Sequence, residues 1–547
     1  MRKTISIMPA TILAVMAAAQ TGGTGLKRFV ISDFGAVADA RTVNTKAIQA
    51  AIDKCAASGG GVVVVPKGTF LSGAIFLKQG VNLNVEKDGV LKGTTNIDDY
   101  PMIATRWEGT EEPWTSAFVN AEGMTDLEIS GEGTIDGSGE EWMQNNPFRG
   151  PAGRGGPGGR GNAAAGAAPA AAVRSASAAP GAGGAAASAA DREAAGEGAA
   201  AGAAAGGGAG AAPAAAARSA SAVAGAGGAA ASAAVREAAG AAPAAAARAA
   251  SAVAGDGVGA APAVAGAAAG GGPGTAPARP PGPRRGRPRL VGIQNSKRVH
   301  VAGLNLHNQA VWCLFVLYSE DVLAENLRIT AEHNIPSSDG IDIDSSKRVR
   351  IDNVYIDVND DCISIKSGKD ADGLRVNRPA EDIIVENSHF AYGHGGVAMG
   401  SETSGGIRNV EVRNCVSDSG NWAPIRFKTQ PSRSGVVENI TYRNITLHET
   451  RQAFEFNLEW RMVPPIAPPA QVLPVVRNVK IINVSGDVQS VGIIHGLAGS
   501  PIRDIRFENC KITAQKGFRL EHARNVDLAG LQLDVKDGEP VTKNDVQ

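Results

Sequence analysis

The sequence is poor in aromatic residues and has almost no net charge. Phe, Trp and Tyr make up 4% of the 547 residues, and the formal net charge at pH 7 is −1. These values exclude binding of nucleic acid through bulk charge, although they leave room for a local basic cleft. The scarcity of aromatics also argues against a broad stacking platform for single strands. We therefore expect no nucleic-acid partner and, with no feature that indicates assembly, a monomer.

Cysteine is scarce as well. The five cysteines are scattered and odd in number, so they match neither a disulfide framework nor the spacing of metal ligands. Their pattern is compatible with a single bridge, but five buried thiols are the simpler expectation. They are Cys55, Cys313, Cys362, Cys415 and Cys510.

Long apolar runs are missing except at the N-terminus. Arg2 and Lys3 precede an apolar stretch from Ile5 to Ala19, which ends in small residues. This is the pattern of a secretory signal peptide, here residues 1–19. An uncleaved anchor is the alternative, but about 15 apolar residues are short for a membrane span. We expect a secreted or periplasmic protein that has no membrane contact after cleavage.

Residues 149–289 lack Ile, Leu, Met, Phe, Tyr and Trp altogether, and 60 of the 110 residues from 161 to 270 are Ala. Within this block, 167–196 and 211–240 are near-identical repeats. Such a composition cannot bury enough apolar area to offset the entropy of ordering, so we expect a disordered or partly helical surface insertion. Its 13 arginines against 5 acidic residues suit an arm that contacts acidic polymer. A tolerated loop expansion is the simpler interpretation.

The sequence outside this block contains a short repeat. Each copy opens on an aliphatic anchor, alternates apolar and polar residues, and reaches Asn or Gly four residues later, as in VHVAG (299–303) and IIVEN (383–387). Asn and Gly are the residues that best tolerate left-handed φ values. The anchors are Leu127, Val299, Val322, Val349, Ile383, Val410, Ile440, Val479, Ile505 and Val526.

This repeat predicts an all-β solenoid. From Val299 onward the anchors are 21 to 39 residues apart, with no amphipathic helix between them. Strands this short are stable only when stacked, and the spacing fits one coil of a parallel β-helix. The pattern of a leucine-rich repeat is absent. We expect residues 26–148 to form the N-terminal part of the β-helix and 290–547 its catalytic coils.

One helix is predicted ahead of the coils. Asn44 is in position to cap it, and Ile48, Ala51, Ile52 and Cys55, together with Ala47, give it an apolar face. The glycine run 59–61 ends the helix, and the apolar strand 62–65 follows. This order of elements is wrong for a phosphate-binding loop. We expect the helix to cover the open end of the solenoid.

Four clusters of polar residues fall on consecutive coils. Asp360 and His394 each lie 11 residues after their anchor, which predicts that they stack on adjacent coils. Asp339 lies one coil earlier and the basic pair one coil later. The clusters are Ser337-Ser338-Asp339-Gly340, Asn359-Asp360-Asp361-Cys362, Gly393-His394-Gly395-Gly396 and Arg426-Phe427-Lys428.

The clusters point to acid–base chemistry. Three carboxylates on neighbouring coils repel one another, so at least one of them should keep its proton to a higher pH than a free Asp. Glycoside hydrolysis needs one acid that protonates the leaving oxygen and a second carboxylate that activates water. Arg426 and Lys428 alternate with Phe427, so both charges lie on one face of a strand, where they are suited to bind a carboxylate.

In these motifs the chain resembles the polygalacturonase family of pectinases, glycoside hydrolase family 28. The family's Asn-Thr-Asp, Asp-Asp, Gly-His-Gly and Arg-Ile-Lys motifs match 337–339, 360–361, 393–395 and 426–428. The opening FGAVADARTVNTKAIQAAID and the later GGGVVVVPKGTF are also similar to this family. The stretch SGKDADGLRVNRPAEDI (367–383) is similar to its bacterial members, many of which are exo-acting.

The resemblance implies a right-handed parallel β-helix that hydrolyses α-1,4-galacturonosyl bonds of pectin with inversion. Asp360 would be the general acid, and Asp339 and Asp361 would position and deprotonate water. His394 would hold the protonation state of the acid. Arg426 and Lys428 would bind the galacturonate carboxylate of a polymer or oligomer. No metal or organic cofactor is implied.

The chain departs from the family at Ser337, which replaces the Asn of the motif. Three aromatic residues are candidates for stacking on a sugar: Trp312, Tyr392 and Trp422. Four functions remain open at this point. Besides a galacturonan hydrolase, they are a hydrolase of rhamnogalacturonan or xylogalacturonan, a Ca²⁺-dependent pectate lyase that uses the same three carboxylates, and a non-catalytic carbohydrate-binding protein.

Overall fold

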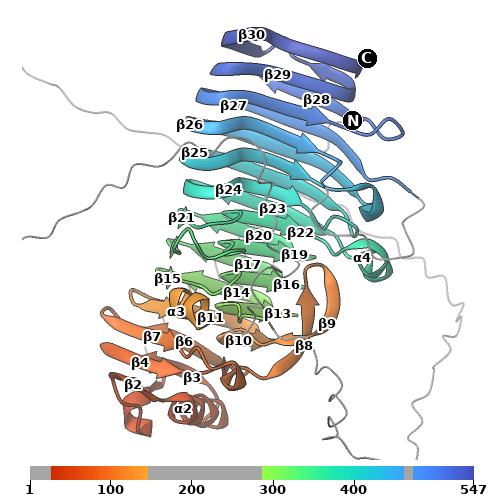
Figure 1. Ribbon diagram of the computed structural model, residues 1–547. Coiled ribbons are helices and arrows are strands. Elements are labelled where there is room, and N and C mark those ends of the chain that lie inside the picture. The colour runs from red at the N-terminus through yellow and green to blue at the C-terminus, as the bar shows by residue number, and fades with distance from the viewer. Residues whose placement is uncertain (1–25, 146–285, 461–471) are drawn as a thin grey trace, which may run out of the picture. The chain divides into compact units, whose positions relative to one another are not determined.

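The computed structural model describes residues 26–145, 286–460 and 472–547. The predicted signal peptide and most of the predicted insertion lie outside these ranges. In the described residues, 28 strands join into one continuous sheet that winds through successive coils (Figure 1). All of these strands pair in parallel, and the architecture is the predicted right-handed parallel β-helix.

Each coil contributes strands to three columns, in which the strands of successive coils lie side by side. The first column holds β1 (Arg28–Val30), β3 (Gly61–Val65), β6 (Val81–Val85), β11 (Thr125–Gly131), β14 (Lys297–Ala302), β17 (Glu320–Glu325), β20 (Lys347–Asp352), β23 (Ala380–Glu386) and β28 (Ile502–Glu508). The second holds β2 (Asp39–Val43), β4 (Gly68–Ser72), β7 (Gly89–Gly93), β12 (Thr134–Asp136), β15 (Asn305–His307), β18 (Arg328–Thr330) and β21 (Tyr355–Asp357). The third holds β5 (Ile75–Phe76), β10 (Val119–Glu122), β13 (Val291–Gln294), β16 (Leu314–Leu317), β19 (Ile341–Asp344) and β22 (Ile363–Lys366).

In the C-terminal half, single long strands run through more than one column. They are β24 (His389–Gly400), β25 (Ile407–Lys428), β26 (Val436–Asn457), β27 (Val475–His495), β29 (Cys510–Asp527) and β30 (Leu531–Val546). The last residues of β24 and β25 extend the third column, because Val397 pairs with Ile363 and Ile425 pairs with Val397.

The predicted register of the repeat is confirmed. Each anchor pairs with the anchor of the next coil, from Leu127 with Val299 to Ile505 with Val526. The Asn residues that follow the anchors have φ values of 51–55°. Their amides form a ladder along the stack, for example from Asn444 to Asn414 at 2.9 Å. Gly131 and Gly303 also have positive φ, whereas Gly530 does not.

Inside the coils the aliphatic side chains form one continuous core. The five cysteines are free and buried, as expected. Burial raises the pKa of the Cys362 thiol, which favours its neutral form. These thiols therefore behave as small apolar core residues.

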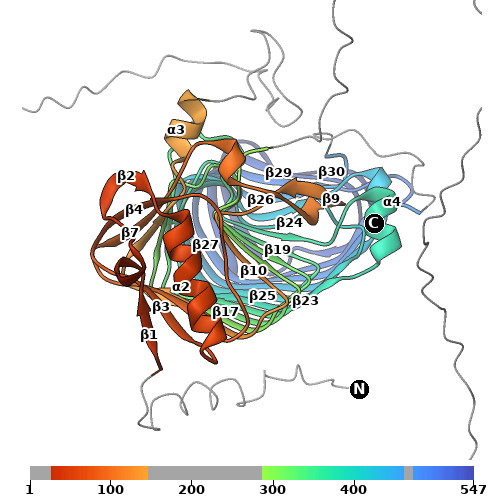
Figure 2. The same ribbon diagram turned by 90° about the horizontal axis from the view of Figure 1, so that it is seen from below.

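The predicted helix is α2 (Thr45–Ala57), which lies at the N-terminal end of the stack (Figure 2). Its predicted apolar face is buried, with Ala47 partly so. The predicted side-chain cap is wrong, because Asn44 makes no capping hydrogen bond. Its amide instead donates to the carbonyls of Val37, Thr42 and Leu71, and so joins the first loop to β4.

The described residues also form several short elements besides the strands of the coils. A feature that the repeat did not predict is an antiparallel hairpin of β8 (Met102–Trp107) and β9 (Thr110–Thr115). The other helices are α3 (Gly139–Gln144), α4 (Asp370–Val376), η1 (Ile31–Phe34), η2 (Ile97–Asp99) and η3 (Pro431–Arg433). Among the described helices, none is long and apolar enough to cross a membrane.

The predicted C-terminal boundary of the insertion, at residue 289, lies too far along the chain. Residues 286–289 belong to the β-helix, because the carbonyl of Arg289 accepts a hydrogen bond from the backbone of Phe118 and its side chain is buried. On the other flank, Arg287 donates to the sulfur of Met143 at 3.4 Å. The two chain segments that border the undescribed part of the insertion therefore lie side by side.

Candidate active site

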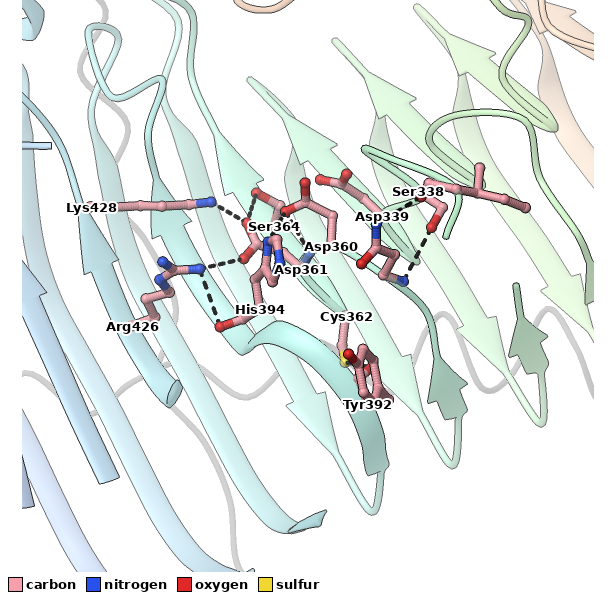
Figure 3. Close-up of polar contacts among 12 residues, drawn as sticks. Ser338, Asp339, Asp360, Asp361, Cys362, Ser364, Tyr392, His394, Arg426 and Lys428 are labelled. Carbon is pink, nitrogen blue, oxygen red and sulfur yellow. Dashed lines mark hydrogen bonds and ion pairs between the residues drawn. The ribbon is translucent and has the colours of Figure 1, made fainter. Parts of the chain in front are cut away.

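The four predicted clusters converge on the outer face of the third column (Figure 3). Asp339 lies just before β19, and Asp360 and Asp361 lie just before β22. His394 lies in β24, and Arg426 and Lys428 lie near the end of β25. Because β19, β22, β24 and β25 are neighbours in this column, each cluster occupies its own coil, as predicted.

The three aspartates form a tight group. One carboxylate oxygen from each of Asp339, Asp360 and Asp361 lies within 4.8 Å of the others. Asp339 and Asp361 are buried, whereas the side chain of Asp360 is 27% exposed. Asp360 is therefore the carboxyl group of the three that a molecule in solution can reach most easily.

His394 stacks on Asp360, as its register predicted. Its backbone N–H donates to the carbonyl of Asp360 at 2.9 Å, and its Nδ1 lies 3.3 Å from Asp360 Oδ1. The glycines beside it are needed for this close approach. A Cβ on Gly393 would lie 2.6 Å from the carbonyl oxygen of Asp360, and one on Gly395 would lie 2.9 Å from Asp361 Oδ1.

The two basic residues face the same way, and Phe427 between them packs in the core, as predicted. Their first partner is Asp361, because Arg426 Nη1 lies 3.3 Å from its Oδ1 and Lys428 forms an ion pair with its Oδ2. Arg426 also pairs with Glu455 at 2.8 Å. The ring of Trp460 lies 4.6 Å from its guanidinium carbon. Lys428 has fewer partners than Arg426, so it is the cation better placed to bind a ligand.

A second charged pair at the site was not predicted. Lys366 Nζ lies 2.7 Å from Asp342 and 3.6 Å from Asp339, and all three side chains are buried. Trp312 covers this lysine, with the ammonium 3.8 Å from the ring centre. The available signal was the alternation in IDID (341–344) and ISIK (363–366), which places charged residues on the outer face of otherwise apolar strands.

The crowding of carboxylates shifts their pKa values in opposite directions. Burial, together with the nearby carboxylates Asp342 and Asp360, raises the pKa of Asp339 well above its usual range. Burial alone would also raise the pKa of Asp360, but the hydrogen bond and charge of His394, aided by Lys428 and Arg426, lower it overall. The expectation that one carboxyl keeps its proton is therefore met at Asp339.

The same contacts indicate how well the three aspartates would hold a metal ion. Within the described residues, the three aspartates are the one group of acidic, histidine and cysteine side chains close enough to share an ion. Both oxygens of Asp361 are already paired with cations. Ca²⁺ takes six to eight oxygen ligands, so this set is a poor Ca²⁺ site.

Ser337, the departure from the family motif, has a left-handed backbone with φ of 57°. Asn adopts this conformation more readily than most other residues. The side chain of the next residue, Ser338, accepts a hydrogen bond from the backbone N–H of Asn359 at 3.1 Å. Ser337 therefore holds a backbone conformation that the Asn of the motif would adopt more readily.

Of the three candidate aromatics, two have covered rings. Trp312 is buried and stacks on Trp107, with ring centres 4.8 Å apart. Tyr392 stacks on His333 at 3.6 Å. Trp422 is 37% exposed, and the guanidinium of Arg451 lies 4.5 Å from its ring centre. Trp422 is therefore the most exposed of the three, with Arg451 over its ring.

A carboxyl group at the surface, two buried carboxylates and a pair of cations on a parallel β-helix define a site of the acid–base type. Residues 273–530 match the model of "Glycosyl hydrolases family 28". Residues 29–143, which include none of the three aspartates, match "Rhamnogalacturonase A/epimerase, pectate lyase-like". The matched stretch contains every predicted site residue, so over the coils that carry the site the chain is similar to this family.

Curated proteins with printed galacturonan-cleaving activities are similar to parts of this chain. A probable polygalacturonase of Vitis vinifera is 29% identical over 41% of this chain and 46% of its own length. An exo-poly-alpha-D-galacturonosidase of Dickeya chrysanthemi is 25% identical over 76% of this chain and 54% of its own length. The chain therefore spans about half the length of these relatives.

Solved structures share the fold. An exopolygalacturonase from Thermotoga maritima aligns over 97% of this chain and 96% of its own, with a TM-score of 0.57 and 22% identity. A family 28 exopolygalacturonase from Yersinia enterocolitica aligns over 96% of this chain and 78% of its own, with a TM-score of 0.64 and 18% identity.

Proposed function

We propose that this protein is a secreted hydrolase of α-1,4-galacturonosyl bonds in pectic polysaccharide or its oligomers. The observation that carries the proposal is the arrangement of Asp360, the reachable carboxyl group, between two buried aspartates and a pair of cations. A glycosidic oxygen above Asp360 can take its proton, while a uronate carboxylate beside it meets Lys428. Residues 1–19 have the pattern of a secretory signal peptide, which supports secretion. Secretion in turn fits a polymer substrate that lies outside the cell.

In this mechanism Asp360 donates its proton to the leaving glycosidic oxygen. A water molecule held by Asp339 and Asp361 attacks the anomeric carbon and loses its own proton to one of these carboxylates. In the free site, however, the pKa of Asp339 is raised and that of Asp360 is lowered, which is the reverse of what these roles require. A substrate carboxylate that engages Lys428 weakens the cationic field that keeps Asp360 ionised. We infer that substrate binding moves the proton to Asp360 and leaves Asp339 as a base.

The distances between the carboxyl groups bear on the stereochemistry of the proposed reaction. In most inverting enzymes the two carboxyl groups lie about 6.5–9.5 Å apart, and in retaining enzymes they lie about 5 Å apart. Here the nearest oxygens lie within 4.8 Å. We nevertheless propose inversion, because three carboxylates are present. Two of them can hold a water molecule while the third protonates the leaving group.

Product analysis on polygalacturonic acid tests the proposal. Hydrolysis should release saturated galacturonate products without loss of rate in a chelator. Nuclear magnetic resonance at early times should show the β-anomer first if the α-bond is inverted. Unsaturated products that need Ca²⁺ would support a pectate lyase instead. Cleavage of rhamnogalacturonan or xylogalacturonan in preference to polygalacturonate would assign the sibling hydrolase activity.

A further inference from the structure

Lys366 is a buried cation beside the three aspartates, and it lies outside the four motifs. It is the last residue of β22, and its side chain is 6% exposed. Its ammonium forms an ion pair with Asp342 at 2.7 Å and a longer one with Asp339 at 3.6 Å. The same charge therefore contacts an aspartate of the site and an aspartate behind it.

Packing holds this lysine in place. The ring of Trp312 covers the ammonium, which lies 3.8 Å from the ring centre. Trp312 in turn stacks on Trp107 of the β8–β9 hairpin at 4.8 Å, and Asp342 is wholly buried. Enclosed in this way, Lys366 cannot turn its charge to the solvent, so the charge stays beside the carboxylates.

Lys366 also keeps its charge. Burial alone would lower the pKa of Lys366, but the nearby carboxylates Asp342, Glu402 and Asp339 raise it well above its usual range. The lysine is therefore cationic at every pH at which an aspartate titrates. It is a fixed positive charge next to groups that exchange protons.

The cations of the site are divided between the aspartates. Arg426 and Lys428 pair with Asp361, whereas in the described part of the chain Lys366 is the only cation that forms an ion pair with Asp339. The other charged groups that act on Asp339 and Asp342 are Asp360, Asp361, Glu402 and Arg289. An ionised Asp339 would thus be repelled by neighbouring aspartates and stabilised by one contacting charge.

Stability alone does not account for such a pair. Replacing a buried ion pair with apolar residues of similar size is often neutral or stabilising, because both charges lose their hydration. The contact with Asp339 gives the pair of Lys366 and Asp342 a role in the reaction instead.

We propose that Lys366 is a positioning residue for the base: it stabilises the Asp339 carboxylate that attacks through water, and Asp342 holds the lysine in place. The inference rests on the proposed function and adds to it the group that allows Asp339 to act as a base. The proton that leaves Asp339 goes to Asp360, and Asp339 later takes one from the attacking water molecule.

The test compares the pH dependence of kcat/KM on polygalacturonate for the wild type, K366M and K366R. The profile declines on its alkaline side as the group of aspartates loses its last proton. An opposite charge in contact lowers a carboxyl pKa by about one to three units, so K366M should move this decline up by about one pH unit or more. Its maximum should fall at least about tenfold, because less of the enzyme pairs an ionised Asp339 with a protonated Asp360. K366R keeps the charge and should stay close to the wild type.

D342N should have the opposite effect on the profile. It removes a negative charge next to Asp339, so the pKa of Asp339 should fall and the alkaline decline should move to lower pH. A purely structural pair would instead lower the stability of both variants without moving the two profiles in opposite directions. The matched control is K347M, whose lysine pairs with Glu320 in the first column and whose profile should match the wild type.

Unmoved profiles, or shifts of the same sign in K366M and D342N, would overturn the role of Lys366. If K366M does not fold, the double variant K366M/D342N, which removes both charges of the pair, is compared with D342N. These two proteins differ at Lys366 alone, so the double variant should decline at the higher pH, and equal profiles would overturn the inference. A wild type that hydrolyses no galacturonan would overturn the proposed function itself.

Discussion

Asp360 differs from its two neighbours in both exposure and proton affinity. It is partly exposed, it contacts His394, and its pKa is lowered in the free site, whereas Asp339 is buried and has a raised pKa. An acid–base pair requires two nearby carboxyl groups with opposite shifts, and in the free site the two directions are the reverse of those that the proposed roles need. The assignment of single roles therefore depends on tests of single residues.

Replacing Asp360 with Asn should remove almost all hydrolysis while the protein stays folded. A positioned general acid supplies about 10²–10⁴-fold in rate, so we expect a loss of roughly a thousandfold. Release of reducing sugar and a thermal melt measure the two quantities. The matched control is D352N on the same coil, whose partners are Arg350 and Asn387. A D360N variant that keeps a tenth of the wild-type rate would contradict the role of Asp360 as the acid.

The Asp342 carboxyl should make the stability of the protein depend on pH. Burial raises its pKa to about 6, despite the lowering effect of Lys366. The folded state therefore holds this proton after the unfolded state has lost it, and stability falls as the pH rises from about 4 to 6. The pKa difference corresponds to on the order of 3 kcal/mol at most.

Chemical denaturation at several pH values checks this effect by comparing the wild type with D342N. The variant will be less stable overall, because Lys366 loses its nearest partner. Its stability should nevertheless decline less than that of the wild type between pH 4 and 6. Parallel declines in the two proteins would show that Asp342 does not titrate in this range.

Lys428 should matter most for substrates that carry a free carboxylate. Loss of a charge-assisted contact costs about 1.5–3 kcal/mol, so K428A should lower activity on polygalacturonate by roughly tenfold to a hundredfold. Highly methylated pectin, which lacks this anion, should already be a poor substrate for the wild type. The control is K347A, whose lysine pairs with Glu320 in the first column. Equal rates on the methylated and free polymers would favour a neutral-sugar substrate.

At the scale of elements, the Asn ladder holds the coils in register. Asn444 has φ of 55° and exchanges side-chain hydrogen bonds with Asn414 and Asn483, both at 2.9 Å. It belongs to the turn that joins the first and second columns, away from the carboxylates. Such a position tests the stability of the fold without touching the site.

N444A should lower the free energy of unfolding by roughly 1–2 kcal/mol, because it loses both hydrogen bonds and places Ala at positive φ. N444G loses the same bonds but tolerates the backbone, so it should lose less stability. Chemical denaturation measures both variants. Equal losses would mean that the backbone conformation contributes little. Activity below the melting range should match the wild type for both.

At the scale of the whole molecule, the insertion and the β-helix should be separable. Residues 150–285 contain no large apolar side chain, and their bordering segments meet where Arg287 contacts Met143. Deleting 150–285 with a short linker should leave the melting temperature nearly unchanged. A decrease of more than about 5 °C would show that the insertion packs on the coils.

Much of the fold and of the candidate site can be predicted from the sequence, because the contacts between successive coils repeat. An aliphatic anchor with Asn four residues later determines one strand and one left-handed turn, so the ten anchors predict the β-helix and its register. Asp360 and His394 share a position within their coils, and stacking brings them together. The same regularity places Asp339 one coil before them and Arg426 and Lys428 one coil after.

The tertiary structure determined the contacts that do not follow from the coil repeat. Arg106 meets Asp344 across 238 residues of sequence, and no repeat relates the hairpin to the coils that it covers. The pairing of Lys428 with Asp361 and of Lys366 with Asp342 depends on which side chains share the outer face once the coils stack. The direction of each pKa shift follows from those pairings and from burial. The sequence by itself determined the fold and the catalytic candidates, whereas three-dimensional packing determined which charged side chains pair and how deeply each of them is buried.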